Sequence, residues 1–270
     1  MTETVARSAW QRLRGFTALK MYPYLVRGFS LAATLVIWEL YGRTVDPIFL
    51  SYPTAICQAV PEMLQRGELQ AAVVASLTEL FVGLTLAISL GTFIGLLMGR
   101  YRTIDYLLDF QISALYSTPN VALIPLIILW FGLDFKAKVF IIFLAGFFPI
   151  IVNTYAGVRN VGRSVVDVAL VEGASEAQIF TKIVVPAALP FIMTGIRLAM
   201  GRAIVGMVVA EMFTAADGLG GAVVAYGNAF ATAKLFVIII ALAILGITLT
   251  EAVKMLERYT APWKETERAS

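Results

Sequence analysis

Long apolar stretches, almost free of charge, constrain the fold of this chain more than any other feature. A helix needs about 20 mostly apolar residues to cross a bilayer. We count six stretches of that length, at residues 27–46, 71–99, 107–132, 138–158, 187–213 and 235–256. Charged residues make up only 14% of the chain, against about 25% in soluble domains. We therefore predict an all-α integral membrane protein with about six transmembrane helices in the lipid bilayer.

The transmembrane domain is expected at residues 27–258, between an N-terminal segment, 1–26, and a C-terminal tail, 259–270. With the N-terminus inside, the inner side holds Arg7, Arg12, Arg14, Lys20, Arg27, Arg100, Arg102, Arg159, Arg163, Lys182, Lys254, Arg258, Lys264 and Arg268. The outer side holds Arg43, Arg66, Lys136, Lys138 and Lys234. Because cytoplasmic loops carry the excess of basic residues, both termini are expected in the cytoplasm.

Residue types that carry much of enzyme and metal chemistry are scarce. The chain has one cysteine, Cys57, and no histidine. This excludes an intrachain disulfide, cysteine or histidine metal clusters and histidine general bases. The sequence also lacks a Gly-x-x-x-x-Gly-Lys-Ser/Thr phosphate loop and a cluster of acids and bases at one membrane depth. We expect no catalytic residues, no metal site and no nucleic-acid partner.

One polar segment, residues 164–186, separates the fourth span from the fifth. Apolar residues recur in it with loose helical spacing, and Gly173 interrupts them as a bend would. Ser175 and Gln178 have the spacing of a capping box at the start of a second helix. Pro186 is expected to mark a boundary before the fifth span, because proline suits a first helical turn but not an interior. We predict a cytoplasmic amphipathic helix or helix pair, whose apolar face packs on the bilayer, the bundle or a cytoplasmic partner.

This segment resembles the coupling motif of ATP-binding-cassette (ABC) importer permeases, which is Glu-Ala-Ala, three residues, Gly, nine residues, then Ile-x-Leu-Pro. Asp167, Val168 and Ala169 stand at the first three positions, Gly173 is the glycine, and Ile183 to Pro186 close the motif. The departures are Asp for Glu, Val for the first Ala and Val for Leu. The stretches "STPNVALIPLIILWFGL", "FFPIIVNTYAGV", "MVVAEMF" and "GLGG" look like the permeases that import nitrate, sulfonates and taurine.

The resemblance implies a type I ABC importer-like fold in a bacterial cytoplasmic (inner) membrane. Two permease chains pair as a homodimer, separate ATP-binding subunits dock beneath them, and an extracytoplasmic substrate-binding protein delivers the substrate. ATP and Mg would be bound by the partner ATPase, with no cofactor in this chain. The expected coupling residues are Asp167, Ala169, Gly173, Ala174, Glu176, Ile183 and Pro186. Glu176 would face the ATPase or water.

Residues that could line the substrate pathway lie in the third and fifth spans. Thr118 and Asn120 flank a proline, so that part of the third span either lines a cavity or is a kinked packing helix. Arg202 lies near the middle of the fifth span, where a charge costs about 2.5–3.5 kcal/mol on insertion scales. It would attract an anionic substrate, or it would have a structural partner such as Glu79, Glu211 or a backbone carbonyl. Glu211 is itself a pathway candidate. Arg197, nearer the inner end, could simply snorkel.

Two glycine-rich features are each open to two interpretations. Gly83, Ala87, Gly91, Gly95 and Gly99 form a stripe of small residues that lets another helix approach closely, within the chain or in a second subunit. We favour packing within the chain. The glycines at 218, 220 and 221 form an outer turn, which is either an ordinary loop or a docking and gating element.

The hypothesis for function is a permease subunit of an ATP-driven importer that works by alternating access. A small anion, such as a sulfonate, taurine, nitrate or an aromatic carboxylate, is the expected substrate. An importer of a neutral vitamin precursor is the alternative within the family. A secondary transporter driven by an ion gradient is the alternative outside it, although the chain has no histidine and its membrane acids lie mostly near span ends.

Overall fold

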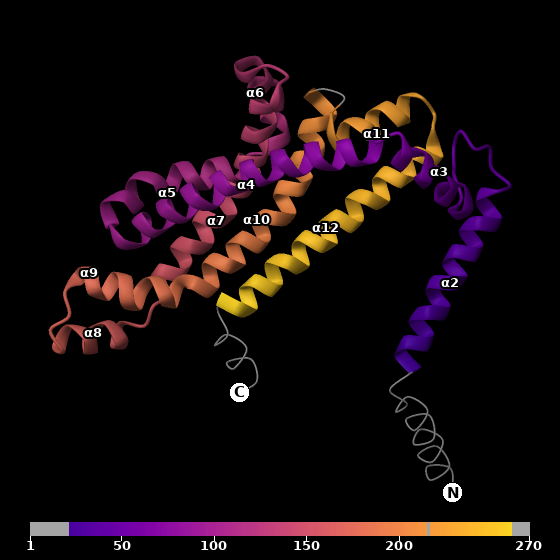
Figure 1. Cartoon of the computed structure of the whole chain (residues 1–270). Coiled ribbons are helices and arrows are strands. Elements are labelled where there is room, and N and C mark those ends of the chain that lie inside the picture. Colours follow the sequence, from indigo (N-terminus) through magenta and orange to yellow (C-terminus); the bar gives the residue numbers. More distant parts are fainter. Residues whose placement is uncertain (1–21, 215–216, 261–270) are drawn as a thin grey trace, which may run out of the picture.

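The computed structural model describes residues 22–214 and 217–260, and its regular elements in these ranges are all helical (Figure 1). They are α2 (Tyr22–Gly42), α3 (Pro53–Gln65), α4 (Glu68–Arg100), α5 (Arg102–Ser117), the 3-10 turn η1 (Asn120–Leu123), α6 (Ile124–Phe131), α7 (Phe135–Arg159), α8 (Arg163–Val171), α9 (Glu176–Ile179), the π-helical turn η2 (Phe180–Val184), α10 (Val185–Thr214), α11 (Gly218–Asn228) and α12 (Thr232–Thr260). The all-α fold class is thus confirmed.

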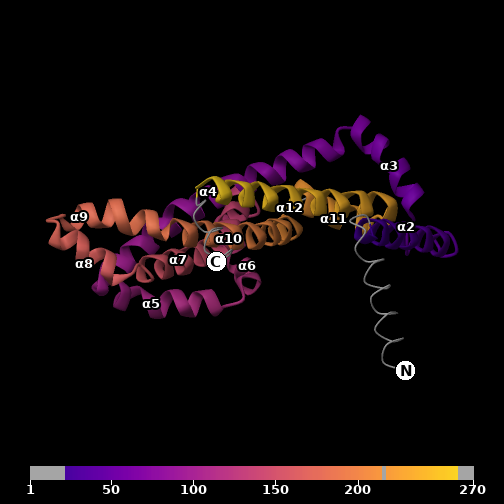
Figure 2. The ribbon, with the colours of Figure 1, turned by 90° about the horizontal axis from the view of Figure 1, so that it is seen from below.

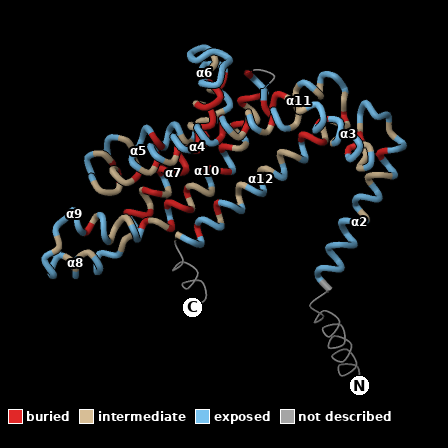
Figure 3. The backbone as a smooth tube through the Cα atoms, in the orientation of Figure 1, coloured by how far each residue is buried: buried red, intermediate tan, exposed pale blue. Residues whose placement is uncertain are grey.

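The core forms where α7 lies between α4 and α10 (Figure 3). On α4, Gly83 faces Ile142, Gly91 faces Ile150, Gly95 faces Thr154 and Gly99 faces Val158. The partners advance in step with the glycines, so α4 and α7 run parallel. Because each glycine lacks a Cβ, the two helices approach closely along their whole shared length. The prediction that this stripe packs within the chain is confirmed.

The predicted third span is not one continuous helix. Helix α5 ends at Ser117, and its axis makes an angle of 91° with the pair η1 and α6 that follows. The cause is local: Thr118 has an extended backbone, as expected for a residue that precedes proline, here Pro119. Five helices of the described residues are therefore long and apolar enough to cross a membrane, or six if the bent pair counts as one span.

The predicted boundary at Pro186 is wrong. Helix α9, the π-helical turn η2 and helix α10 run on as a single helix from Glu176 to Thr214, 39 residues long. Pro186 has no N–H to give to the carbonyl of Lys182. The backbone takes the wider π register in the turn just before it, over residues 180–184, and the helix continues.

Helix α2 stands apart from the bundle (Figures 1 and 2). Only 6% of its candidate span is buried. It is held near its C-terminal end by Trp38. The Trp38 indole N–H donates to the carbonyl of Ser51 at 2.9 Å, and the centres of the Trp38 and Phe236 rings lie 5.4 Å apart. Figure 2 also shows α5 and α12 on different sides of α7 and α10.

The two ends of the bundle carry different elements. Helices α8 and α9 lie at one end, and α3 and α11 lie at the other (Figure 1). Helices α3 and α11 lie in the segments 47–69 and 214–234, which connect predicted spans.

Candidate functional site

The turn between α8 and α9 has the geometry of a helix C-terminal cap in which glycine is required. Gly173 has φ of +79°, a left-handed conformation. Its N–H donates to the Leu170 carbonyl at 3.0 Å, and the Ala174 N–H donates to the Ala169 carbonyl at 2.9 Å. This pair of bonds is the Schellman motif, in which a left-handed residue closes the last turn of a helix. Three predicted coupling residues, Ala169, Gly173 and Ala174, thus build one turn.

The start of α9 is fixed by the predicted capping box. The Gln178 N–H donates to the Ser175 hydroxyl at 3.3 Å, and the Ser175 N–H donates to the Gln178 side-chain oxygen at 2.8 Å. The capping-box prediction is confirmed. With a Schellman turn before it and a capping box after it, the connection between α8 and α9 has little freedom to change its angle.

Helix α8 presents an apolar surface that nothing in the described chain covers. It contains no buried residue, and its exposed large side chains are Val165, Val168, Leu170 and Val171. The exposed fraction of Val171 reaches 86%. The carboxylates of Asp167 and Glu176 are also exposed beside it. An exposed apolar patch rimmed by charge is typical of a protein interaction site.

Arg100, at the end of α4, fastens this segment to the bundle. Its guanidinium group lies 4.6 Å from the ring centre of Phe180 and 5.2 Å from that of Tyr101. One of its nitrogens lies 3.9 Å from the Glu176 carboxylate. A cavity of about 450 Å³ separates these residues from α8. The sequence did not predict this contact, because Arg100 served only as one of the basic residues that orient the chain in the membrane.

The predicted pathway residues do not form one cluster. The guanidinium group of Arg202 lies 4.8 Å from the ring centre of Tyr116 in α5. Thr118 lies just after Tyr116, at the break of the third span, and Asn120 begins the turn that follows. The suggested pairing of Arg202 with Glu79 or Glu211 is wrong, since both carboxylates have other partners. Arg197 forms an ion pair with Glu257 at 3.0 Å.

Glu211 is almost fully buried, with 1% of its surface exposed, and it caps helix α11. Its carboxylate accepts hydrogen bonds from the Ser76 hydroxyl and from the Gly220 N–H, the latter at 2.6 Å. Ser76 in turn accepts from the Leu219 N–H at 2.8 Å. The glycine-rich stretch is therefore the buried first turn of α11. The pathway role of Glu211 stays a prediction, and the carboxylate is enclosed in this conformation.

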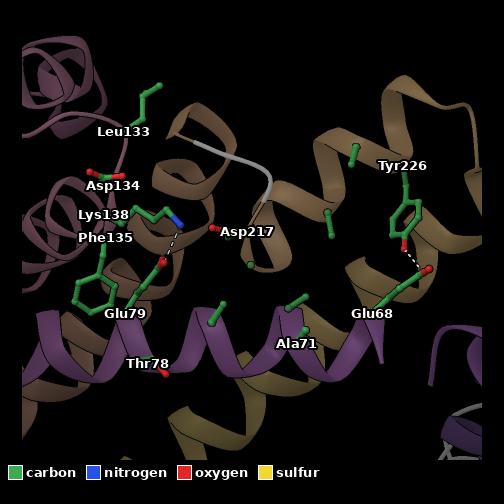
Figure 4. Close-up of a pocket in the computed structure, with 15 residues that line it drawn as sticks. Glu68, Ala71, Thr78, Glu79, Leu133, Asp134, Phe135, Lys138, Asp217 and Tyr226 are labelled. Carbon is green, nitrogen blue, oxygen red and sulfur yellow. Dashed lines mark hydrogen bonds and ion pairs between the residues drawn. The ribbon is translucent and has the colours of Figure 1, made fainter. Parts of the chain in front are cut away.

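A cavity of about 600 Å³ opens between α4, α7 and α11 (Figure 4). Lys138 points across it and forms an ion pair of 2.8 Å with Glu79. At its far end the Tyr226 hydroxyl donates to Glu68 at 2.6 Å. Burial, together with this hydrogen bond, raises the pKa of Tyr226 to about 12, so the phenol keeps its proton and remains a donor. Among the described residues, no group of three or more His, Cys, Asp or Glu side chains has the arrangement of a metal site.

Several spanning helices joined to a short, exposed helix pair at one end define the class of the protein: a multi-pass helical membrane protein. The sequence profile of the binding-protein-dependent transport system inner membrane component matches residues 87–262. The chain belongs to this family and is a transport permease subunit of an ABC importer, not an enzyme.

Individual relatives agree with this assignment. The chain is 34% identical over 250 residues to a Bacillus subtilis (strain 168) protein that carries the name aliphatic sulfonates transport permease protein SsuC, covering 92% of this chain and 90% of the relative. It is 32% identical to the taurine transport system permease protein TauC of Escherichia coli (strain K12), covering 87% and 88%. The fold is similar to a solved structure of the MetNI methionine ABC transporter, with a TM-score of 0.60, 18% identity, and coverage of 72% and 96%.

Proposed function

We propose that this chain forms, as a homodimer, the membrane pathway of an importer for small oxyanions such as sulfonates or taurine. A separate ATPase docks on α8 and α9 and drives alternating access. An extracytoplasmic binding protein delivers substrate to the end that carries α3 and α11. The distribution of lysine and arginine supports this orientation, which places α8, α9 and both termini in the cytoplasm.

One observation carries the proposal: the uncovered apolar surface of α8 is linked by fixed turns to a helix that crosses the membrane. Val168 and Val171 are exposed on that surface, and Gly173 and Ser175 fix the turn to α9. From Glu176 onward the chain is helical as far as Thr214. A partner that moves α8 therefore moves a membrane helix with it.

The homodimer is supported by helix α2. A membrane helix reaches close packing through small residues and polar contacts with neighbours. Only 6% of the candidate span in α2 is buried by the described residues, although its C-terminal end is held by Trp38. A second permease chain would supply the missing neighbour.

The names of the relatives support the substrate class. Both SsuC and TauC are named for sulfonate-type substrates, and a sulfonate group carries a permanent negative charge at neutral pH. An arginine within a spanning helix, here Arg202, offers such a group a positive charge of the opposite sign.

Co-purification with the ATPase tests the proposal. The chain is co-expressed with its candidate ATPase as wild type, as Gly173→Arg and as Gly162→Ala. Gly173 has φ of +79°, so arginine strains the backbone there and adds a bulky cation beside the docking surface. Gly162 has φ of −59°, and an added Cβ meets only the Ser164 hydroxyl at 3.7 Å, so alanine is compatible.

We expect the wild type and Gly162→Ala to retain the ATPase in detergent and Gly173→Arg to lose it. A wild type that binds no ATPase, yet transports when an ion gradient is imposed, would replace the importer with a secondary transporter. ATP-driven uptake of a neutral pyrimidine in preference to taurine would support the importer assignment and contradict the anionic substrate class.

A further inference from the structure

Arg202 differs in its partners from two other cations of the described spanning helices. Lys138 is paired with Glu79, and Arg197 is paired with Glu257. For the guanidinium group of Arg202, the described residues supply neither an ion pair nor a hydrogen bond. The guanidinium group instead makes a cation–π contact with Tyr116, whose ring centre lies 4.8 Å from the guanidinium carbon.

The described helices of the chain leave the face of α10 that carries Arg202 exposed. Its exposed residues follow helical spacing along one side: Phe191, Leu198, Arg202, Val205 and Met212. A charged side chain in the middle of a span faces the protein interior or a water-filled cavity, not lipid. The face of α10 at Arg202 therefore borders either water or a second subunit.

Helix α5 presents a polar stripe beside this position. Asp109, Ser113 and Ser117 recur every four residues and are all exposed, and Tyr116 lies on the same side of the helix. The ring of Tyr116 also lies near Phe148 of α7, with ring centres 6.3 Å apart. A polar stripe within a predicted span is unsuited to lipid but suited to a solute path.

The contact with Tyr116 leaves the N–H groups of Arg202 without a hydrogen-bond partner among the described residues. The N–H groups of a guanidinium group match the oxygens of a sulfonate or carboxylate in a two-point interaction. A ring also leaves the positive charge uncompensated, whereas a buried carboxylate would neutralise it.

We infer that Arg202, oriented by Tyr116, is an anion-binding position inside the transport path, where the head group of a sulfonate or carboxylate substrate binds in passing. The inference rests on the proposed function. It adds that substrate charge is selected in the membrane as well as by the binding protein. Arg202 is exposed, so an anion bound there can leave again.

Transport in proteoliposomes tests the inference. The permease, its ATPase and its binding protein are reconstituted together, and uptake of radiolabelled taurine is measured with the ATPase rate. The variants are Arg202→Gln, Arg202→Lys, Tyr116→Leu and Tyr116→Phe. We expect Arg202→Gln to lower uptake at least tenfold, with a raised KM for the delivered substrate. The subunit composition of the purified complex should stay unchanged.

The other variants separate charge from orientation. Arg202→Lys keeps the charge without the planar fork and should be intermediate. Tyr116→Phe keeps the ring and should transport like the wild type, whereas Tyr116→Leu should resemble Arg202→Lys. Wild-type uptake by Arg202→Gln would overturn the inference, and so would loss of the permease dimer in that variant, which would make Arg202 a subunit contact.

A second measurement applies if the wild type does not transport taurine. The purified permease–ATPase complex is titrated calorimetrically with ethanesulfonate, benzoate and nitrate. Binding of one of these anions that disappears in Arg202→Gln supports the inference. Identical titrations of the wild type and the variant overturn it, even where ATP-driven uptake of a neutral compound shows that the importer assignment is correct.

Discussion

The ammonium group of Lys138 in α7 lies 2.8 Å from the carboxylate of Glu79 in α4, and both side chains are buried. This ion pair joins the two parallel core helices near the cavity of Figure 4. Removing one partner of a buried pair costs about 3–5 kcal/mol, because the other charge stays buried without compensation. Lys138→Met should therefore lower thermal stability in detergent sharply. The double variant Lys138→Met with Glu79→Leu should recover most of the loss, and a double variant as unstable as the single one would contradict this account.

The Schellman turn predicts an effect from the smallest possible change. Gly173→Ala adds one methyl group that meets no atom within 4 Å, so its effect comes from the left-handed backbone. That conformation costs a residue with a Cβ roughly 1–2 kcal/mol. We expect faster hydrogen exchange across residues 163–179 and less uptake per ATP hydrolysed. Gly162→Ala is the matched control and should leave both measurements unchanged.

The stack of Arg100 on Phe180 predicts a defect in transmission without a defect in docking. Arg100→Gln removes both ring contacts, each worth about 0.5–2 kcal/mol depending on exposure. The surface of α8 is untouched, so the ATPase should still co-purify, while uptake per ATP hydrolysed should fall several-fold. Arg102→Gln changes a neighbouring exposed cation and should behave like the wild type. Loss of the ATPase from Arg100→Gln would assign Arg100 to docking instead.

The α4–α7 interface predicts that glycine tolerance depends on position. A Cβ at Gly95 would lie 2.6 Å from the Cβ of Thr154, whereas a Cβ at Gly246 in α12 meets nothing within 4 Å. Overpacking a core typically costs about 1–3 kcal/mol. Gly95→Ala should lower the melting temperature in detergent, and Gly246→Ala should leave it unchanged or raise it slightly. Equal melting temperatures would show that the two helices separate readily.

The bonds around Ser76 predict a local effect on α11. Ser76→Ala removes the donor to Glu211 and the acceptor for the Leu219 N–H. Leaving a buried polar group unsatisfied costs about 1–3 kcal/mol. Amide exchange measured by mass spectrometry over residues 218–228 should accelerate by about five- to hundred-fold. Thr78→Ala is the control, since its hydroxyl bonds only the Val74 carbonyl of its own helix, and acceleration in both variants would contradict the assignment.

Local sequence signals predicted most of what is local in this fold. Apolar runs of sufficient length identified the spans, and the spacing of Ser175 and Gln178 identified the start of α9. The prolines were harder to interpret. Pro119 breaks its span at a right angle, while Pro186 is absorbed by a π-helical turn, and the sequence around each does not distinguish the two outcomes.

Contacts between distant segments could not be predicted in this way. Ser76 and Glu211 lie 135 residues apart, and neither has a sequence signal that specifies the other. The same holds for Arg100 and Phe180. Charge placement showed which residues needed a partner in the membrane, but only the packing of α4, α7 and α10 determines which partner each one has.

The uninterrupted helix from Glu176 to Thr214 has a mechanical consequence. At 1.5 Å per residue, its 39 residues form a rod about 58 Å long, longer than a bilayer is thick. No loop lies between the capping box at one end of this helix and Arg202, about two thirds of the way along it. A tilt of α9 is therefore transmitted along the helix to Arg202. The π-helical turn at residues 180–184 is the one segment of irregular helical pitch along that helix within the described chain. The helix would pivot at this segment. A displacement of α9 would then move Arg202, with any anion bound there, from one side of the membrane toward the other.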